Sequence, residues 1–199
     1  MSRVSELTFA NREADDKTLF GFWVYLMTDC VLFGSIFATY AVLHNNTYGG
    51  PGGGDIFYLP TVLAETVILL TSSFTCGMAV LAARMNRPRQ LLAWLAVTFI
   101  LGLSFLGLEL NEFHGLMAEG NSWARSGFLT SFFTLVGTHG LHISIGLIWM
   151  ATMMAKIFQA GLKPANLRQL TMLGLFWHFL DVIWIFIFSM VYLFGGLGV

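Results

Sequence analysis

The sequence predicts an all-α membrane protein, a bundle of five transmembrane helices with its N-terminus in the cytoplasm and its C-terminus in the periplasm. Of its 199 residues, 56% are hydrophobic and only 11% are charged, whereas an ordinary soluble domain carries about 25% charged residues. Five apolar runs are long enough to cross a bilayer, which takes ~20 residues each. Nearly all basic residues lie on one side of these runs, and this asymmetry sets the orientation.

Each apolar run is expected to form one helix of the length that spans a bilayer. No internal repeat and no second domain is visible, so residues 1–199 are expected to form a single membrane domain. Short links separate the runs, and the first link contains the glycine-rich turn Gly49-Gly50-Pro51-Gly52-Gly53-Gly54. The expected spans are 19–43, 59–83, 91–117, 127–158 and 167–194.

The positions of lysine and arginine orient the helices, because cytoplasmic segments retain positive charge. Nine of the ten basic residues lie before the first run, around the second link or around the fourth link, and only Arg125 lies on the other side. The nine are Arg3, Arg12, Lys17, Arg84, Arg87, Arg89, Lys156, Lys163 and Arg168. The N-terminus is therefore expected in the cytoplasm and the C-terminus outside.

Composition and local patterns argue against several classes of protein. A formal net charge of -1 on an apolar chain gives no reason to expect nucleic acid as a ligand. Cys30 and Cys76 lie inside apolar runs, so neither a disulfide framework nor a zinc spacing is present. Residues 1–17 lack the apolar core of a secretory signal, so the first run is expected to be an uncleaved helix. No nucleophile has a base at a usable spacing.

The last run carries an imidazole and a carboxylate near its centre. His178 and Asp181 are three residues apart, nearly one helical turn, so both leave the same helix face. A carboxylate near the middle of a membrane helix costs about 2.5 to 3.5 kcal/mol on insertion scales. Both side chains are therefore expected to look into protein, toward partners on other helices.

Further ionisable residues fall inside the runs in two layers, counted at ~1.5 Å per residue from the helix starts. The layer near the midplane holds Asp29, His139 and His178. The layer nearer the external surface holds Glu65, Glu109, Glu112 and His114. Such layering is typical of an interhelical network of polar side chains. The expected members of a structural network are Asp29, Glu65, Glu112, His139, His142, His178 and Asp181.

The histidines also suggest an alternative, a freestanding membrane cytochrome or metalloenzyme that uses His139, His142 and His178 as ligands. Haem sites inside helical bundles typically need histidines that face each other from two helices, and carboxylate-bridged iron sites need Glu-x-x-His pairs, which this sequence lacks. The residues favour a hydrogen-bond network instead. Small residues on the fourth run would let its neighbours approach closely; they are Gly137, Gly140, Ser144 and Gly146.

Asp29 leaves two interpretations open, because it has no basic neighbour one turn away. In the first, it is a buried carboxylic acid that stays neutral and bonds to a neighbouring helix. In the second, it belongs to a proton relay or contacts a lipid or a partner subunit.

Five motifs occur together along the chain: Gly21-Phe22-Trp23, Thr28-Asp29-Cys30-Val31-Leu32-Phe33, Glu112-Phe113, Thr138-His139-Gly140-Leu141-His142 and Trp177-His178-Phe179-Leu180-Asp181-Val182-Ile183-Trp184. Together they resemble subunit III of the haem-copper terminal oxidases. The five-helix length, with stretches such as Asp55-Ile56-Phe57, is most similar to subunit III of bacterial cytochrome o ubiquinol oxidase.

The resemblance implies a noncatalytic subunit of a proton-pumping quinol oxidase in the aerobic respiratory chain of a bacterial inner membrane. It implies no haem, copper or quinol site in this chain, because those belong chiefly to the catalytic subunit I, which this subunit would stabilise. It also implies a cleft that holds phospholipid. Asp29 falls where related subunits carry an intramembrane glutamate. Lys156 falls where they carry an arginine that binds lipid phosphate, although lysine lacks the bidentate fork of arginine.

Overall fold

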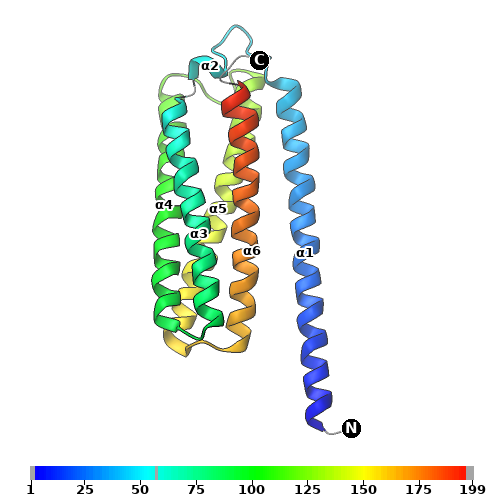
Figure 1. Ribbon diagram of the computed structural model, residues 1–199. Coiled ribbons are helices and arrows are strands. Elements are labelled where there is room, and N and C mark those ends of the chain that lie inside the picture. The colour runs from blue at the N-terminus through cyan, green and yellow to red at the C-terminus, as the bar shows by residue number, and fades with distance from the viewer. Residues whose placement is uncertain (1–2, 57, 196–199) are drawn as a thin grey trace.

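The computed structural model describes residues 3–56 and 58–195, and the side chains of residues 17–54, 56, 58–163 and 165–195. Figure 1 shows the later long helices gathered in a bundle, with the first long helix alongside. The elements are α1 (Arg3–Leu43), α2 (Gly53–Ile56), α3 (Leu59–Arg84), α4 (Pro88–Ala118), α5 (Gly127–Ala160), α6 (Pro164–Ile187) and the π-helical turns η1 (Phe188–Phe194) that continue α6.

Among the residues that the structure describes, five helices are long and apolar enough to cross a membrane, which confirms the predicted all-α fold with five such helices. The spans are Lys17–Leu43, Leu59–Arg84, Pro88–Ala118, Gly127–Ala160 and Ala165–Phe194. Among the spans, the largest difference from the predicted ends is in α4, which begins at Pro88 rather than at residue 91, and the helix α1 extends back to Arg3, ahead of its span. Proline suits the first turn of a helix, so the polar residues after it join the helix.

Residues with a left-handed backbone follow three of the helices. Asn86 (φ 56°) comes after α3, Gly120 (φ 81°) after α4 and Gly161 (φ 71°) after α5. Such a residue reverses the chain while the last helical carbonyls find partners, and glycine adopts it without steric cost. At the other end of α5, Ser126 Oγ accepts a hydrogen bond from the N–H of Leu129 at 3.2 Å. From α3 onward, consecutive long helices are therefore antiparallel neighbours, whereas α1 packs against α5 and α6.

The two ends of the bundle differ in what they carry. In Figure 1 the links 85–87 and 161–163 lie at the same end as the start of α1, and α2 lies at the opposite end with the last turns of η1. The segments that carry nine of the ten basic residues therefore share one end of the molecule.

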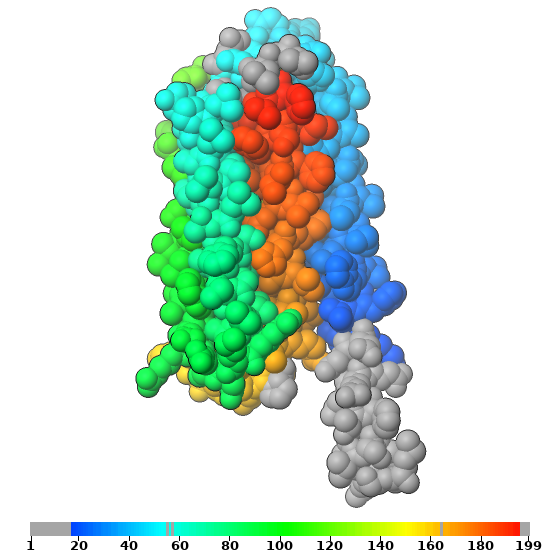
Figure 2. All heavy atoms as spheres, in the orientation of Figure 1, coloured from blue at the N-terminus to red at the C-terminus, as the bar shows by residue number. Residues whose placement is uncertain are grey.

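α6 is the most buried of the five spans and α1 is the least buried. In the most apolar part of α6, 61% of residues are buried, compared with 22% in α1. α6 packs against α3 and α5, whereas α1 contacts α5 and, less extensively, α6. The space-filling view shows α6, in orange and red, between α3 and α1 on this face (Figure 2).

Trp177 of α6 determines how closely the helices around it approach. Its side chain is fully buried. A Cβ added at Gly102 of α4 or at Gly146 of α5 would come within 3.0 Å of the indole ring. The indole N–H donates to Ser72 Oγ of α3 at 2.8 Å. Small residues and one interhelical hydrogen bond therefore hold four helices around this ring.

Candidate functional site

The residues of the predicted network lie in separate places in the structure. One group joins α1 to α5, a second joins α6 to α3, and a third lies inside the bundle between α3, α4 and η1.

Asp29 of α1 faces His142 of α5. Asp29 Oδ2 lies 3.8 Å from His142 Nε2, and the two side chains are only 10% and 11% exposed. The other ring nitrogen, Nδ1, lies 2.8 Å from the carbonyl oxygen of Thr138. A carbonyl oxygen can only accept, so Nδ1 donates that bond and Nε2 is the nitrogen left for Asp29. The buried ring of Phe33 packs on the imidazole at 5.2 Å between ring centres and covers the pair.

His178 and Asp181 form the second group on one face of α6. His178 Nδ1 lies 3.8 Å from Asp181 Oδ2. Ser73 of α3 joins them, with its Oγ 2.7 Å from the same ring nitrogen. The Asp181 side chain is 7% exposed and the His178 side chain is 46% exposed. The expectation that both side chains face partners on other helices stays a prediction: Asp181 is nearly buried and His178 contacts Ser73 of α3, while part of the His178 ring is exposed in this chain by itself.

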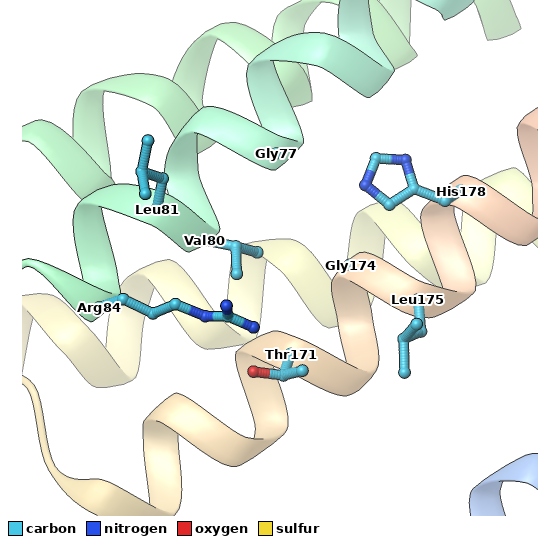
Figure 3. A pocket seen from close by; sticks show the side chains of 8 residues that line it. All are labelled: Gly77, Val80, Leu81, Arg84, Thr171, Gly174, Leu175 and His178. Carbon is cyan, nitrogen blue, oxygen red and sulfur yellow. The ribbon is translucent and has the colours of Figure 1, made fainter.

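His178 is exposed because it lines a groove between α3 and α6 (Figure 3). The groove has a volume of about 350 Å³, and its lining residues are Gly77, Val80, Leu81, Arg84, Thr171, Gly174, Leu175 and His178. Nothing lies within 4 Å of the position that a Cβ of Gly77 would take. In Figure 3 the imidazole marks one end of the groove, and Arg84 extends toward Thr171 at the other. The groove is thus apolar along its length and basic at one end.

The third group gathers three carboxyl groups inside the bundle. Glu65 of α3 is 0% exposed and Glu109 of α4 is 2% exposed. Glu112, almost one turn after Glu109, accepts a hydrogen bond from Tyr192 Oη of η1 at 3.4 Å. The interior position of Glu109 depends on Gly140 of α5, because a Cβ there would lie 2.6 Å from Glu109 Oε1.

His139 is fully buried among aromatic rings. Its ring centre lies 5.9 Å from that of Phe105 and 5.3 Å from that of Trp184. Neither ring nitrogen has a hydrogen-bond partner in the described part of the chain. His139 therefore lies in the predicted region of the bundle but makes no polar contact there.

The three histidines of the alternative interpretation do not share a site. His142 faces Asp29, and His178 contacts Ser73 on the other side of α6. Among the residues that the structure describes, no three His, Cys, Asp or Glu side chains are arranged to hold a metal ion. The cytochrome or metalloenzyme interpretation thus gains no support from the geometry.

Lys156 lies on the exposed surface of α5, near the end that carries the basic links. Its Nζ donates to Gln169 Oε1 of α6 at 3.4 Å. The ammonium group has other donors to spare, so the predicted contact with a lipid phosphate stays a prediction.

Sequence reasoning missed Ser73, Arg84 and Tyr192 as members of these groups. Ser73 had a signal, because Ser72 and Ser73 are adjacent polar residues in the middle of an apolar run. Arg84 was considered only as one of the basic residues that orient the helices, and not as part of a site. Nothing in the sequence marks the phenol of Tyr192 as a partner of Glu112.

Comparisons with known proteins agree over almost the whole chain. The family model for Cytochrome c oxidase subunit III matches residues 8–196. The chain is 58% identical over 185 residues to the Cytochrome bo(3) ubiquinol oxidase subunit 3 of Pseudomonas aeruginosa, covering 93% of this chain and 88% of that protein.

More distant relatives are subunits of oxidases with other names. The chain is 42% identical over 189 residues to the Cytochrome c oxidase subunit 3 of Bacillus sp. (strain PS3), covering 95% of this chain and 91% of that protein. It is also 42% identical over 183 residues to the Quinol oxidase subunit 3 of Bacillus subtilis, covering 92% of this chain and 90% of that protein.

Proposed function

The chain belongs to the cytochrome c oxidase subunit III family, and from this we propose that it is the noncatalytic subunit III of a proton-pumping haem-copper quinol oxidase. The observation that carries the proposal is the 58% identity to a ubiquinol oxidase subunit over 93% of this chain. Because that identity exceeds the 42% to a cytochrome c oxidase subunit, ubiquinol is the favoured electron donor of the complex.

In the proposed complex, haem and copper belong to the catalytic subunit I, and this chain stabilises that subunit. The geometry supports a structural role, because the polar side chains join helices to each other. Asp29 connects α1 to α5, and Ser72 and Ser73 connect α3 to α6. Such contacts give a small bundle a defined shape on which a larger subunit can pack.

The proposed setting is a bacterial inner membrane, with the N-terminus in the cytoplasm. Nine of the ten basic residues support this orientation. Reporter fusions within 85–90 and 159–166 should report the cytoplasm, and fusions within 44–58 or at the C-terminus should report the outside. A cytoplasmic C-terminus would contradict the orientation.

Purification of the complex tests the function directly. The tagged chain, extracted from membranes in mild detergent, should bring down the other oxidase subunits, identified by mass spectrometry, together with a haem absorption spectrum. The chain separated from them should lack that spectrum. A chain that purifies alone, or that carries haem itself, would defeat the proposal.

Phospholipid is the second proposed partner, with its phosphate on Lys156. The exposed position of Lys156 at the basic end of α5 supports this contact. Quantification of lipid retained by the purified complex should show less phospholipid in Lys156→Ala and wild-type retention in Lys156→Arg. Equal retention in all three proteins would place the lipid elsewhere.

A further inference from the structure

We propose that the groove between α3 and α6 is the docking site for a transmembrane helix of a partner subunit, one that presents a hydrogen-bonding side chain to His178 and a carboxylate to Arg84. The inference rests on the proposed function, because it assigns the face through which this chain joins its complex. It follows from the depth of His178, the shape of the groove and the charge at its end.

His178 lies near the middle of its span. It comes 13 residues after Ala165 and 16 residues before Phe194, the two ends of that span (178 minus 165, and 194 minus 178). Its Nδ1 is hydrogen-bonded to Ser73 Oγ at 2.7 Å and lies 3.8 Å from Asp181 Oδ2. Its Nε2 has no hydrogen bond in the described part of the chain, and 46% of the side chain is exposed. Hydrocarbon tails offer this nitrogen no partner, whereas intramembrane ionisable residues face protein or a polar cavity.

Several hydroxyl side chains on the outer surface differ from His178, because their own helix satisfies them. Each of several exposed hydroxyls donates to a backbone carbonyl three or four residues earlier, so each can face lipid without an unpaired group. They are Thr28, Ser35, Thr71 and Ser104. The imidazole Nε2 has no such hydrogen bond to its own helix among the described residues. This difference indicates that protein covers the groove.

The groove has the shape of a helix-packing site. Gly77 leaves an open hollow on α3, and the apolar side chains of Val80, Leu81 and Leu175 form its walls (Figure 3). Small residues at such positions let a second helix approach closely in a membrane. An apolar side chain of the partner helix would fill the hollow at Gly77.

Arg84 supplies the charge that selects the partner. It lies at the end of α3, and no ion pair or hydrogen bond to it is present among the described residues. Ser73, which is level with His178, lies eleven residues before it (84 minus 73), a rise of roughly 16 Å. The arginine side chain extends back along the groove (Figure 3), so the two partner groups should be about two to three turns apart. A lipid phosphate would satisfy Arg84 but would leave His178 unpaired, which favours a protein helix.

The test compares two glycine substitutions in the full complex. Gly77→Leu fills the groove, and Gly107→Leu on α4 is the control, because nothing lies within 4 Å of a Cβ at either position. We expect Gly77→Leu to lower the ratio of haem-containing subunits to tagged chain several-fold after purification in mild detergent. Gly107→Leu should match wild type. Thermal unfolding of the two purified chains should be alike, which separates loss of docking from loss of folding.

A photo-crosslinking side chain at Leu81 identifies the occupant. We expect an adduct with another subunit of the complex, and this adduct should weaken in His178→Leu. Wild-type subunit ratios in Gly77→Leu, or an adduct with phospholipid alone, would overturn the inference while the proposed function stands. Failure of the unmodified chain to bring down haem-containing subunits would instead defeat the proposed function.

Discussion

Two histidine–carboxylate pairs in this molecule have the same separation and opposite surroundings. Asp29 and His142 lie 3.8 Å apart on different helices, and both are nearly covered. His178 and Asp181 also lie 3.8 Å apart, but on one helix, with the histidine 46% exposed. The first pair can tie α1 to the bundle, whereas the second also presents a ring to whatever covers α3 and α6. The two pairs have the same chemistry, so the packing around each pair decides whether it holds two helices together or faces a partner.

The largest expected effect comes from removing the covered carboxylate. Asp29→Leu leaves the buried His142 Nε2 without its polar neighbour, and an unsatisfied buried group costs about 1–3 kcal/mol. The thermal unfolding midpoint of the purified chain in detergent should fall. Val31→Leu, at a position that is 73% exposed, is the control and should unfold like wild type. A normal midpoint for Asp29→Leu would show that this pair does not hold α1.

A smaller effect is expected at the exposed pair, His178 and Asp181, and it should appear as weaker assembly of the complex. Asp181→Ala removes the buried carboxylate beside His178. The loss should destabilise the packing of α6 by about 1 kcal/mol or somewhat more. Retention of the chain in the purified complex should fall more than electron transfer slows in complexes that keep it. Normal retention with failed oxygen reduction would contradict a structural role for Asp181.

The next effect is the coupling within the covered pair. Interhelical polar pairs in membrane proteins contribute about 0.6 kcal/mol on average in double-mutant cycles. A cycle of Asp29→Leu and His142→Leu, measured by unfolding of the purified chain, should give a favourable coupling of that order. Purely additive effects would show that the two residues stabilise the chain separately.

The fold was predictable because each span is a local property of the chain. Length and hydropathy determine five helices, and the three-residue spacing of His178 and Asp181 places them on one face. The groups around these residues were not predictable, because their partners are distant in sequence. Ser73 lies 105 residues from His178, and the groove that His178 lines is completed by Gly77 and other residues of α3. The interior position of Glu109 similarly depends on Gly140.

The smallest effect should follow Asp29→Asn, which keeps the shape of the covered pair and removes its capacity to ionise. His142 Nδ1 donates to the carbonyl of Thr138, so Nε2 is the nitrogen that faces position 29 at 3.8 Å, and an asparagine there presents it with a polar amide of the same shape. Unfolding midpoint, assembly and initial turnover should therefore stay close to wild type.

The decisive measurement for Asp29 is the proton-to-electron ratio of the complex in reconstituted vesicles. If Asp29 serves only to hold α1 against α5, Asp29→Asn should pump like wild type. The spans support this expectation, because the part of α1 that precedes Asp29 offers few polar groups for a proton path, with Tyr25 and Thr28 the nearest. Thr28 already donates to the carbonyl of Tyr25 at 2.6 Å. Loss of pumping in Asp29→Asn, with the subunit fully retained, would show instead that ionisation of Asp29 is required, and the covered pair would then belong to proton transfer as well as to packing.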